Sequence, residues 1–140
     1  MKHHFSITPR IIAHFGEDLI KNESIAILEL VKNSYDACAT ECKVEFYSRN
    51  KELEKIVISD NGFGMNANII KNVWLVVGTN HKKNAKKNQC GRYPLGEKGI
   101  GRLGVHKLGK KIRLFSKTIN DKEVELSIDW TELENAKQID

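Results

Sequence analysis

Hydrophobic residues recur with helical spacing in four parts of the chain. The expected helices cover about residues 8–20, 22–39, 66–77 and 99–108. The first opens with a threonine and a proline, which are typical of an N-cap and of the first helical position. The last is expected to close at Gly109, a C-terminal cap. One or two further helical turns should follow the last strand.

Two pairs of β-branched or alternating segments predict β-hairpins. In the first, residues 43–47 pair with 56–58 across a polar link at 48–54. In the second, residues 112–116 pair with 124–130 around an Asn-Asp turn. Helices interleave with these strands. We therefore expect an α+β fold, a two-layer sandwich in which one mostly antiparallel mixed sheet is covered by helices.

The helix expected at 22–39 carries a polar stripe. At 100° per residue, Glu29, Asn33 and Asp36 share one narrow strip, although asparagine is a poor helix former. The residues predicted to form the opposite, buried face are Ile27, Leu28, Leu30, Val31, Tyr35 and Cys38. The stripe is either an ordinary solvated face or one wall of a functional site.

Composition favours one domain in a reducing compartment. A chain of 140 residues with 40% hydrophobic content can form one compact core. No apolar run is long enough to span a membrane and the first residues lack a signal peptide, so we expect a cytoplasmic protein without a membrane partner. Cys38, Cys42 and Cys90 form no C-x-x-C pair and are odd in number, which predicts reduced thiols.

Positive charge is concentrated in one segment. Residues 78–113 contain eleven Lys or Arg and one acid, so the net charge of this segment is +10. Because the whole chain has a net charge of +5, the remainder carries −5. Such a cluster suits an anionic partner, either nucleotide phosphates or a nucleic acid, and is otherwise a solvated basic loop. Residues 78–98 show no periodicity, and a connection of that length in a small domain is typical of a functional lid.

A carboxylate follows the first hairpin, in the stretch ISDNGFGM. Asp60 ends an apolar strand, and Gly62 and Gly64 follow at once, so the carboxylate lies at a tight turn where a ligand can approach the backbone. Such a carboxylate can accept a hydrogen bond from a planar ring amine, with Met65 beside the ring. A plain strand-to-helix turn would use the same residue types.

The stretch LGEKGIGRLGVHKLG, residues 95–109, is a glycine-rich approach to a helix. It matches G-x-G-x-x-G, but no strand precedes it, so we reject a dinucleotide-binding fingerprint; it is not a P-loop either. Free N–H groups at a helix start, together with Lys98, would form an anion site. The alternative is a flexible linker.

The order of these three motifs resembles the GHKL ATPase superfamily over roughly residues 5–130. That group includes type II topoisomerase ATPase subunits, ninety-kilodalton heat-shock chaperones, MutL and MORC proteins, and sensor histidine kinases. The chain is most similar to the chaperone, MutL and MORC-like branch, especially to prokaryotic multidomain proteins that begin with this module. The resemblance implies binding and hydrolysis of ATP with Mg²⁺.

The resemblance also implies a role for each matching residue. Glu29 would be the general base, Asn33 the Mg²⁺ ligand and Asp36 a support of the site, while Ala37 would line the adenine pocket and Asp60 would receive the adenine amino group. The other matches are Gly62, Gly64 and Met65 at the adenine turn, Gly96, Lys98, Gly99, Ile100 and Gly101 in the phosphate loop, and Thr79 and Lys82 in the lid-opening stretch GTNHK. In that stretch Asn80 replaces the family's usual serine.

Three functional hypotheses follow. The first is an ATPase, which Glu29 distinguishes from a histidine kinase because that branch generally lacks this glutamate. The second is a nucleotide-gated scaffold that hydrolyses ATP slowly and dimerises on binding it; the third is a nucleic-acid-binding module. Because the family's domain continues with more strands, we expect residues 1–140 to be the N-terminal part of a larger protein, with domains following and an incomplete adenine pocket that binds nucleotide weakly.

Overall fold

The computed structural model describes residues 22–75, 86–96 and 104–135. Its elements are α2 (Glu23–Asp36), β1 (Cys42–Arg49), β2 (Glu52–Asp60), α3 (Ala67–Ile69), the π-helical turn η1 (Ile70–Trp74), α4 (Val105–Leu108), β3 (Lys111–Ser116), β4 (Val124–Asp129) and α5 (Trp130–Asn135). The helix expected at 8–20 lies outside the described residues. No helix among the described residues is long and apolar enough to cross a membrane.

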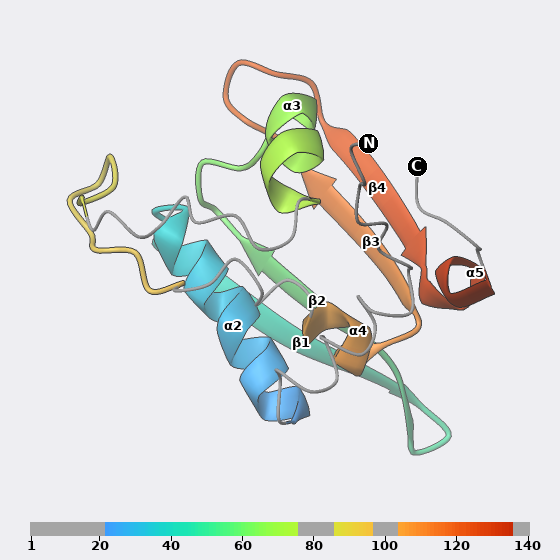
Figure 1. Ribbon diagram of the computed structural model, residues 1–140. Helices are drawn as coiled ribbons and strands as arrows, with labels where there is room; N and C mark the ends of the chain where they lie inside the picture. Colours follow the sequence, from blue (N-terminus) through green and yellow to red (C-terminus); the bar gives the residue numbers. More distant parts are fainter. Residues whose placement is uncertain (1–21, 76–85, 97–103, 136–140) are drawn as a thin grey trace, which may run out of the picture.

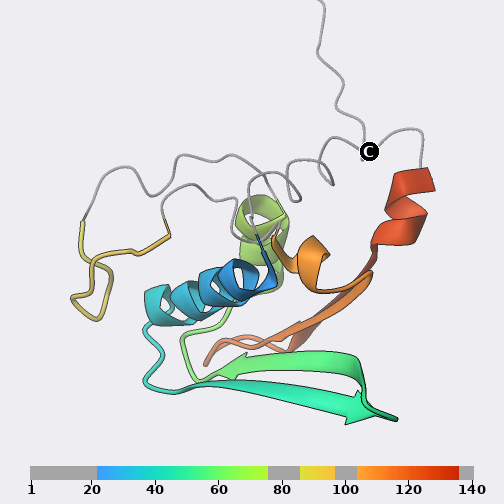
Figure 2. The same cartoon turned by 90° about the horizontal axis from the view of Figure 1, so that it is seen from below.

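Helices lie over one side of two hairpins, which confirms the α+β class. In both views α2 and α4 lie on the same side of the strands (Figures 1 and 2). The described strands form two separate two-stranded antiparallel sheets, β1-β2 and β3-β4, rather than the one expected sheet. The chain leaves β2 through a turn in which Met65 N donates to the side chain of Ser116 at 2.7 Å. This side-chain bond links the turn after β2 to the last residue of β3.

The first hairpin is longer than the sequence predicted. Its register runs from Cys42 opposite Asp60 to Arg49 opposite Glu52. Instead of a polar link over 48–54, only two residues connect the strands, Asn50 and Lys51 with φ of 53° and 67°. Two positive φ values match the twist of paired strands, so strand pairing continues to the turn.

Helices α2 and α3 begin near their predicted positions, whereas the predicted start of the helix at 99–108 lies outside the described residues. Asn22 caps α2 by accepting from the amide of Ile25 at 3.0 Å, and Asn66 caps α3 by accepting from Ile69 at 3.0 Å. Helix α2 ends at Asp36, three residues before the expected end. Gly109 is the C-cap of α4, as expected, and has an extended conformation with φ of 179°.

The second hairpin and the final helix are confirmed. Lys111 pairs with Asp129 and Ser116 with Val124, and the connecting residues include the expected Asn-Asp pair. Helix α5 starts at Trp130, whose ring meets that of His106 from α4 edge-on, with ring centroids 5.1 Å apart. This contact joins α4 to the far end of the hairpin.

Candidate functional site

The polar stripe of α2 is partly covered, and the predicted apolar face is only partly correct. Glu29, Asn33 and Asp36 are all half-buried. Leu28 and Tyr35, which were predicted to be buried, are 51% and 38% exposed. Small residues explain the difference, because Ala26 and Ser34 are the fully covered positions of the helix and let it approach its neighbours closely. The helix is therefore rotated so that the stripe borders its contact surface.

Ser34 joins α2 to the end of β2. Ser34 is 3% exposed, and its hydroxyl donates to Oδ2 of Asp60 at 2.9 Å. The other oxygen of Asp60 accepts from the amide of Gly62 at 2.9 Å. Asp60 itself is exposed, so its carboxylate is held in place and still open to a ligand. A carboxylate oxygen has two lone pairs, so each oxygen of Asp60 can still accept one more hydrogen bond.

The turn after Asp60 is fitted closely to the end of α2. A Cβ on Gly62 would lie 2.7 Å from the carbonyl oxygen of Ala37 and 2.8 Å from its Cβ. The amide of Phe63 donates to the same carbonyl at 2.9 Å. Asn61 adds a second connection, since its side chain accepts from the amide of Thr40 at 2.9 Å and donates to its hydroxyl at 2.8 Å. Glycine at position 62 is thus needed for contact with the helix.

Gly64 has a packing role as well. Its φ is +70°, and a Cβ there would overlap the carbonyl of Lys117, just after β3. Met65 follows, half-buried beside Ser116. These two contacts fix the turn that carries Asp60 against the second hairpin.

Asp36 binds the beginning of the glycine-rich stretch. Its Oδ1 accepts from the amide of Leu95 at 2.7 Å, and its Oδ2 accepts from the amide of Gly96 at 3.1 Å. The structure therefore gathers Asp36, Ala37, Asp60, Gly62 and Gly96 around the C-terminal end of α2. Glu29 and Asn33 lie further back along the same helix, and Gly64 and Met65 lie where the turn meets the second hairpin. The predicted site residues outside the described residues are Thr79, Lys82, Lys98, Gly99, Ile100 and Gly101.

The carboxylate of Glu29 forms an ion pair within the helix. Its Oε1 accepts from Nζ of Lys32 at 2.7 Å, and both side chains are partly exposed. Such partly exposed pairs contribute at most about 1 kcal/mol. A group competing for Glu29 would therefore meet little resistance from this pair.

A family model described as "Histidine kinase-, DNA gyrase B-, and HSP90-like ATPase" matches residues 21–140. The chain belongs to this ATPase family. The match spans all the described elements, and it confirms the family that the three motifs resembled. ATP binding is the general property of such a domain.

This ATPase domain also resembles part of a curated protein. It is 31% identical over 111 residues to "Putative type II restriction enzyme HgiDII" of Herpetosiphon aurantiacus, covering 79% of this chain. The matched region is 17% of that relative. The chain thus spans a small part of the relative's length.

The prediction of reduced thiols is wrong for two of the three cysteines of the ATPase domain. Cys38 and Cys90 form a disulfide, with Cα atoms 6.0 Å apart, and Cys42 is free. The fold brings together two cysteines 52 residues apart, which no C-x-x-C spacing could indicate.

Sequence reasoning also missed several polar residues that hold the site. Ser34 sits eight residues after Ala26, on the same covered side of α2, and this spacing of small residues was the available signal. Asn61, Asn88 and Arg92 gave no such signal, because each acts by bonding backbone groups that are distant in sequence.

Proposed function

We propose that this chain is the Mg²⁺-dependent ATP-binding and ATP-hydrolysing module of a larger protein. The observation that carries the proposal is the 2.9 Å hydrogen bond from Ser34 to Asp60. It fixes a strand-end carboxylate against the helix that bears Glu29 and Asn33. A nucleotide whose base reaches Asp60 would then have α2 as one wall of its site.

Asp60 is the proposed acceptor for the exocyclic amino group of adenine. Both of its oxygens already accept one hydrogen bond, from Ser34 and from Gly62, which sets their orientation before a ligand arrives. Adenine offers an N–H donor where guanine offers a carbonyl oxygen. A carboxylate would attract the first and repel the second, so we expect a preference for ATP over GTP. Ala37 and Met65 would flank the base.

Glu29 is the proposed general base for the attacking water. Transfer of a phosphoryl group to water needs one oriented water and neutralisation of charge, with little covalent work by the protein. A glutamate one turn before Asn33 can supply the first requirement. Its ion pair with Lys32 is weak enough to exchange for that water.

Asn33 is the proposed protein ligand of Mg²⁺. The described residues contain no group of three or more His, Cys, Asp or Glu that could hold a metal. Magnesium keeps several waters and takes phosphate oxygens as ligands, so one amide oxygen on a half-buried helix face fits this ion. When bound, Mg²⁺ would neutralise charge on the phosphates.

The remaining assignments concern the phosphates and the protein around them. By family resemblance, the proposed phosphate site comprises Gly96, Lys98, Gly99, Ile100 and Gly101, with Thr79 and Lys82 in a lid at about 78–98. Asp36 supports it by binding the amides of Leu95 and Gly96. ATP-driven lid closure, dimerisation and a cytoplasmic location belong to the same proposal.

A second candidate is a nucleotide-gated module that binds ATP with little hydrolysis in a protein that acts with nucleic acid. The observation that favours it is the similarity to a protein named as a restriction enzyme. The basic segment 78–113 would suit such a partner. The rate of ATP hydrolysis distinguishes the two candidates.

Two substitutions in the full-length protein test the proposal. Glu29→Gln should keep ATP affinity and lower the hydrolysis rate by about 10²–10⁴-fold, the usual contribution of a general base. Glu23→Gln is the matched control, because Glu23 is an exposed acid in the first turn of the same helix. Phosphate release and calorimetric ATP binding are the measurements. Equal hydrolysis rates in the two variants would refute the assignment of Glu29.

Asp60→Asn tests the base site. Asparagine has one acceptor oxygen in place of two, so ATP affinity should fall by about 10–100-fold, the loss of a hydrogen bond to a charged group. The amide donor should at the same time narrow the preference for ATP over GTP. Unchanged selectivity in a folded variant would contradict the role of Asp60.

A further inference from the structure

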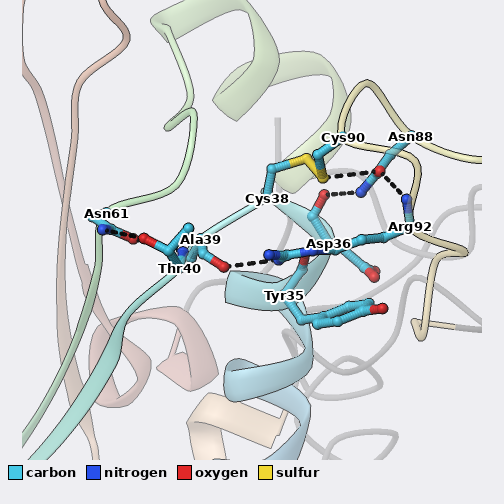
Figure 3. Close-up of a disulfide and its surroundings, with 9 residues drawn as sticks. All are labelled: Tyr35, Asp36, Cys38, Ala39, Thr40, Asn61, Asn88, Cys90 and Arg92. Atoms are coloured by element: carbon cyan, nitrogen blue, oxygen red, sulfur yellow. Dashed lines mark hydrogen bonds between the residues drawn. A yellow bond between two sulfur atoms is a disulfide. The ribbon is translucent and has the colours of Figure 1, made fainter.

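Residues 88–92 form a clasp over the end of α2, made by Asn88, Cys90 and Arg92 (Figure 3). Cys90 is joined to Cys38 by the disulfide, which closes a loop across a sequence separation of 52 residues. The clasp segment follows the basic part of the expected lid and precedes the glycine-rich stretch. It lies beside the C-terminal end of α2 in Figure 1.

The non-covalent contacts of the clasp bind carbonyl groups at the end of the helix. Arg92 Nη1 donates to the carbonyl of Ala39 at 2.8 Å and to that of Tyr35 at 3.2 Å. Its guanidinium lies 4.7 Å from the centre of the Tyr35 ring. Asn88 Nδ2 donates to the carbonyl of Asp36 at 3.1 Å. The clasp is thus specific to this helix end and does not depend on the disulfide alone.

The clasp is connected to the proposed phosphate site through Asp36. That residue accepts from Asn88 with its backbone and from the amides of Leu95 and Gly96 with its side chain. Gly96 is four residues beyond Arg92 in the sequence. A closed clasp therefore restricts where the glycine-rich stretch can begin.

The disulfide is placed where a small thiol can reach it. Cys90 is exposed and Cys38 is half-buried. Cys38 also has a φ of 62°, in the left-handed position after a helix where glycine is usual. Cysteine disfavours this conformation, and a residue that served only to make the turn would be glycine. The geometry thus favours a role for the thiol itself.

We propose that the Cys38–Cys90 disulfide is a thiol-controlled switch of nucleotide affinity, closed when oxidised and open when reduced. The inference rests on the proposed function. A dithiol reductant attacks Sγ of Cys90 as a thiolate, forms a mixed disulfide and releases Cys38 as a thiolate. The second thiol of the reductant then releases Cys90. Two electrons and two protons pass to the cysteine pair, and the reductant leaves as a disulfide.

Reduction removes the covalent link and leaves the hydrogen bonds of Asn88 and Arg92, with the contact between Arg92 and the Tyr35 ring, to close the clasp. If the clasp is then closed for about a tenth to a third of the time, the apparent dissociation constant for ATP rises by the inverse of that fraction, about three- to tenfold. The change appears in affinity, because the clasp contains none of the groups assigned to chemistry.

The experiment compares oxidised and reduced full-length protein by two readouts. Calorimetry with ATP and Mg²⁺ gives the affinity, and hydrogen exchange measured by mass spectrometry gives the protection of segment 86–96 without any nucleotide. Cys90→Ser removes the disulfide and keeps Cys42, so it controls for effects of the reductant on the free thiol. Cys38→Gly is a second variant that suits the positive φ and protects the test against a folding defect.

We expect reduction of the wild type to weaken ATP binding about three- to tenfold and to lower the protection of segment 86–96. Both variants should have the ATP affinity and the protection of the reduced wild type, and the reductant should change neither value. Equal affinity and equal protection in the two redox forms would overturn the inference and leave the proposed function intact. A redox-dependent change in protection, with no ATP binding in either form, would instead refute the proposed function.

Discussion

Replacing Gly64 by alanine should destabilise the fold much more than replacing Gly91. Both glycines have positive φ, +70° and +78°, so both substitutions incur the left-handed penalty of about 1–2 kcal/mol. They differ in their surroundings. An added Cβ at Gly91 meets nothing within 4 Å, whereas at Gly64 it overlaps the carbonyl oxygen of Lys117 and lies 2.7 Å from the carbonyl carbon.

The steric part of the penalty at Gly64 can be worked from that contact. Carbon atoms in contact are normally about 3.5–4.0 Å apart. The turn and the residue after β3 must therefore separate by about 1 Å, which strains the neighbouring bond from Met65 to Ser116. Overpacking of this kind costs about 1–3 kcal/mol. Gly64→Ala should lose about 2–5 kcal/mol in total, against about 1–2 kcal/mol for Gly91→Ala.

Urea unfolding followed by circular dichroism measures this difference, with both variants kept oxidised. Thermal midpoints should fall as well, by about 2–4 °C for each kcal/mol in a domain near this size. If Gly64→Ala were no less stable than Gly91→Ala, the inferred close packing of the turn after β2 against the second hairpin would be wrong.

Two further predictions concern a buried hydroxyl and a surface ion pair. Ser34→Ala should weaken ATP binding about tenfold, because Asp60 loses a charge-assisted hydrogen bond. Ser48→Ala, at an exposed position of β1, should leave ATP binding unchanged. Calorimetry measures both affinities. The hydrogen bond between Lys111 and Asp129 lowers the pKa of Asp129 below 3.8 and raises that of Lys111 above 10.5. The stability from Asp129 is therefore lost as pH falls through its lowered pKa, and that from Lys111 as pH rises through its raised pKa. Urea unfolding against pH should show both losses, and Asp129→Asn should remove them.

Local signals predicted the elements well because they depend on neighbouring residues. Asn22 and Asn66 cap the helices that follow them, at the positions where those helices were predicted to begin. The short turn at Asn50 and Lys51 was missed because lysine is not a usual residue for positive φ. The prediction of the apolar face of α2 was partly wrong because the helix contacts its neighbours through small residues. Such residues contribute little to a pattern of hydrophobic spacing.

The structure joins α2 to the turn after β2 and to the start of the glycine-rich stretch, but the bonds that join them were not predictable. Asp60 ends a strand and Asp36 ends a helix, and both facts are local. Their partners, Ser34 and the amides of residues 95–96, are 26 and about 60 positions away. Polar contacts over such separations leave no periodicity, so the stretch from 86 to 96 was predicted to lack structure although it closes on α2.

The end of α2 shows why these distant contacts belong together. The last four carbonyl groups of a helix lack partners within it and must be satisfied by other groups. Here Asn33, Ser34 and Tyr35 accept from the amides of the turn that follows. The clasp and the turn after β2 bind further carbonyls near this end. Arg92 donates to the carbonyls of Tyr35 and Ala39, and Asn88 donates to that of Asp36. The amide of Phe63 donates to the carbonyl of Ala37. Carbonyl groups at and just after the end of α2 therefore also hold the clasp and the turn after β2 against the helix, while the side chain of Asp36 holds the glycine-rich stretch. A change that frees these carbonyls would disturb both halves of the proposed nucleotide site at once.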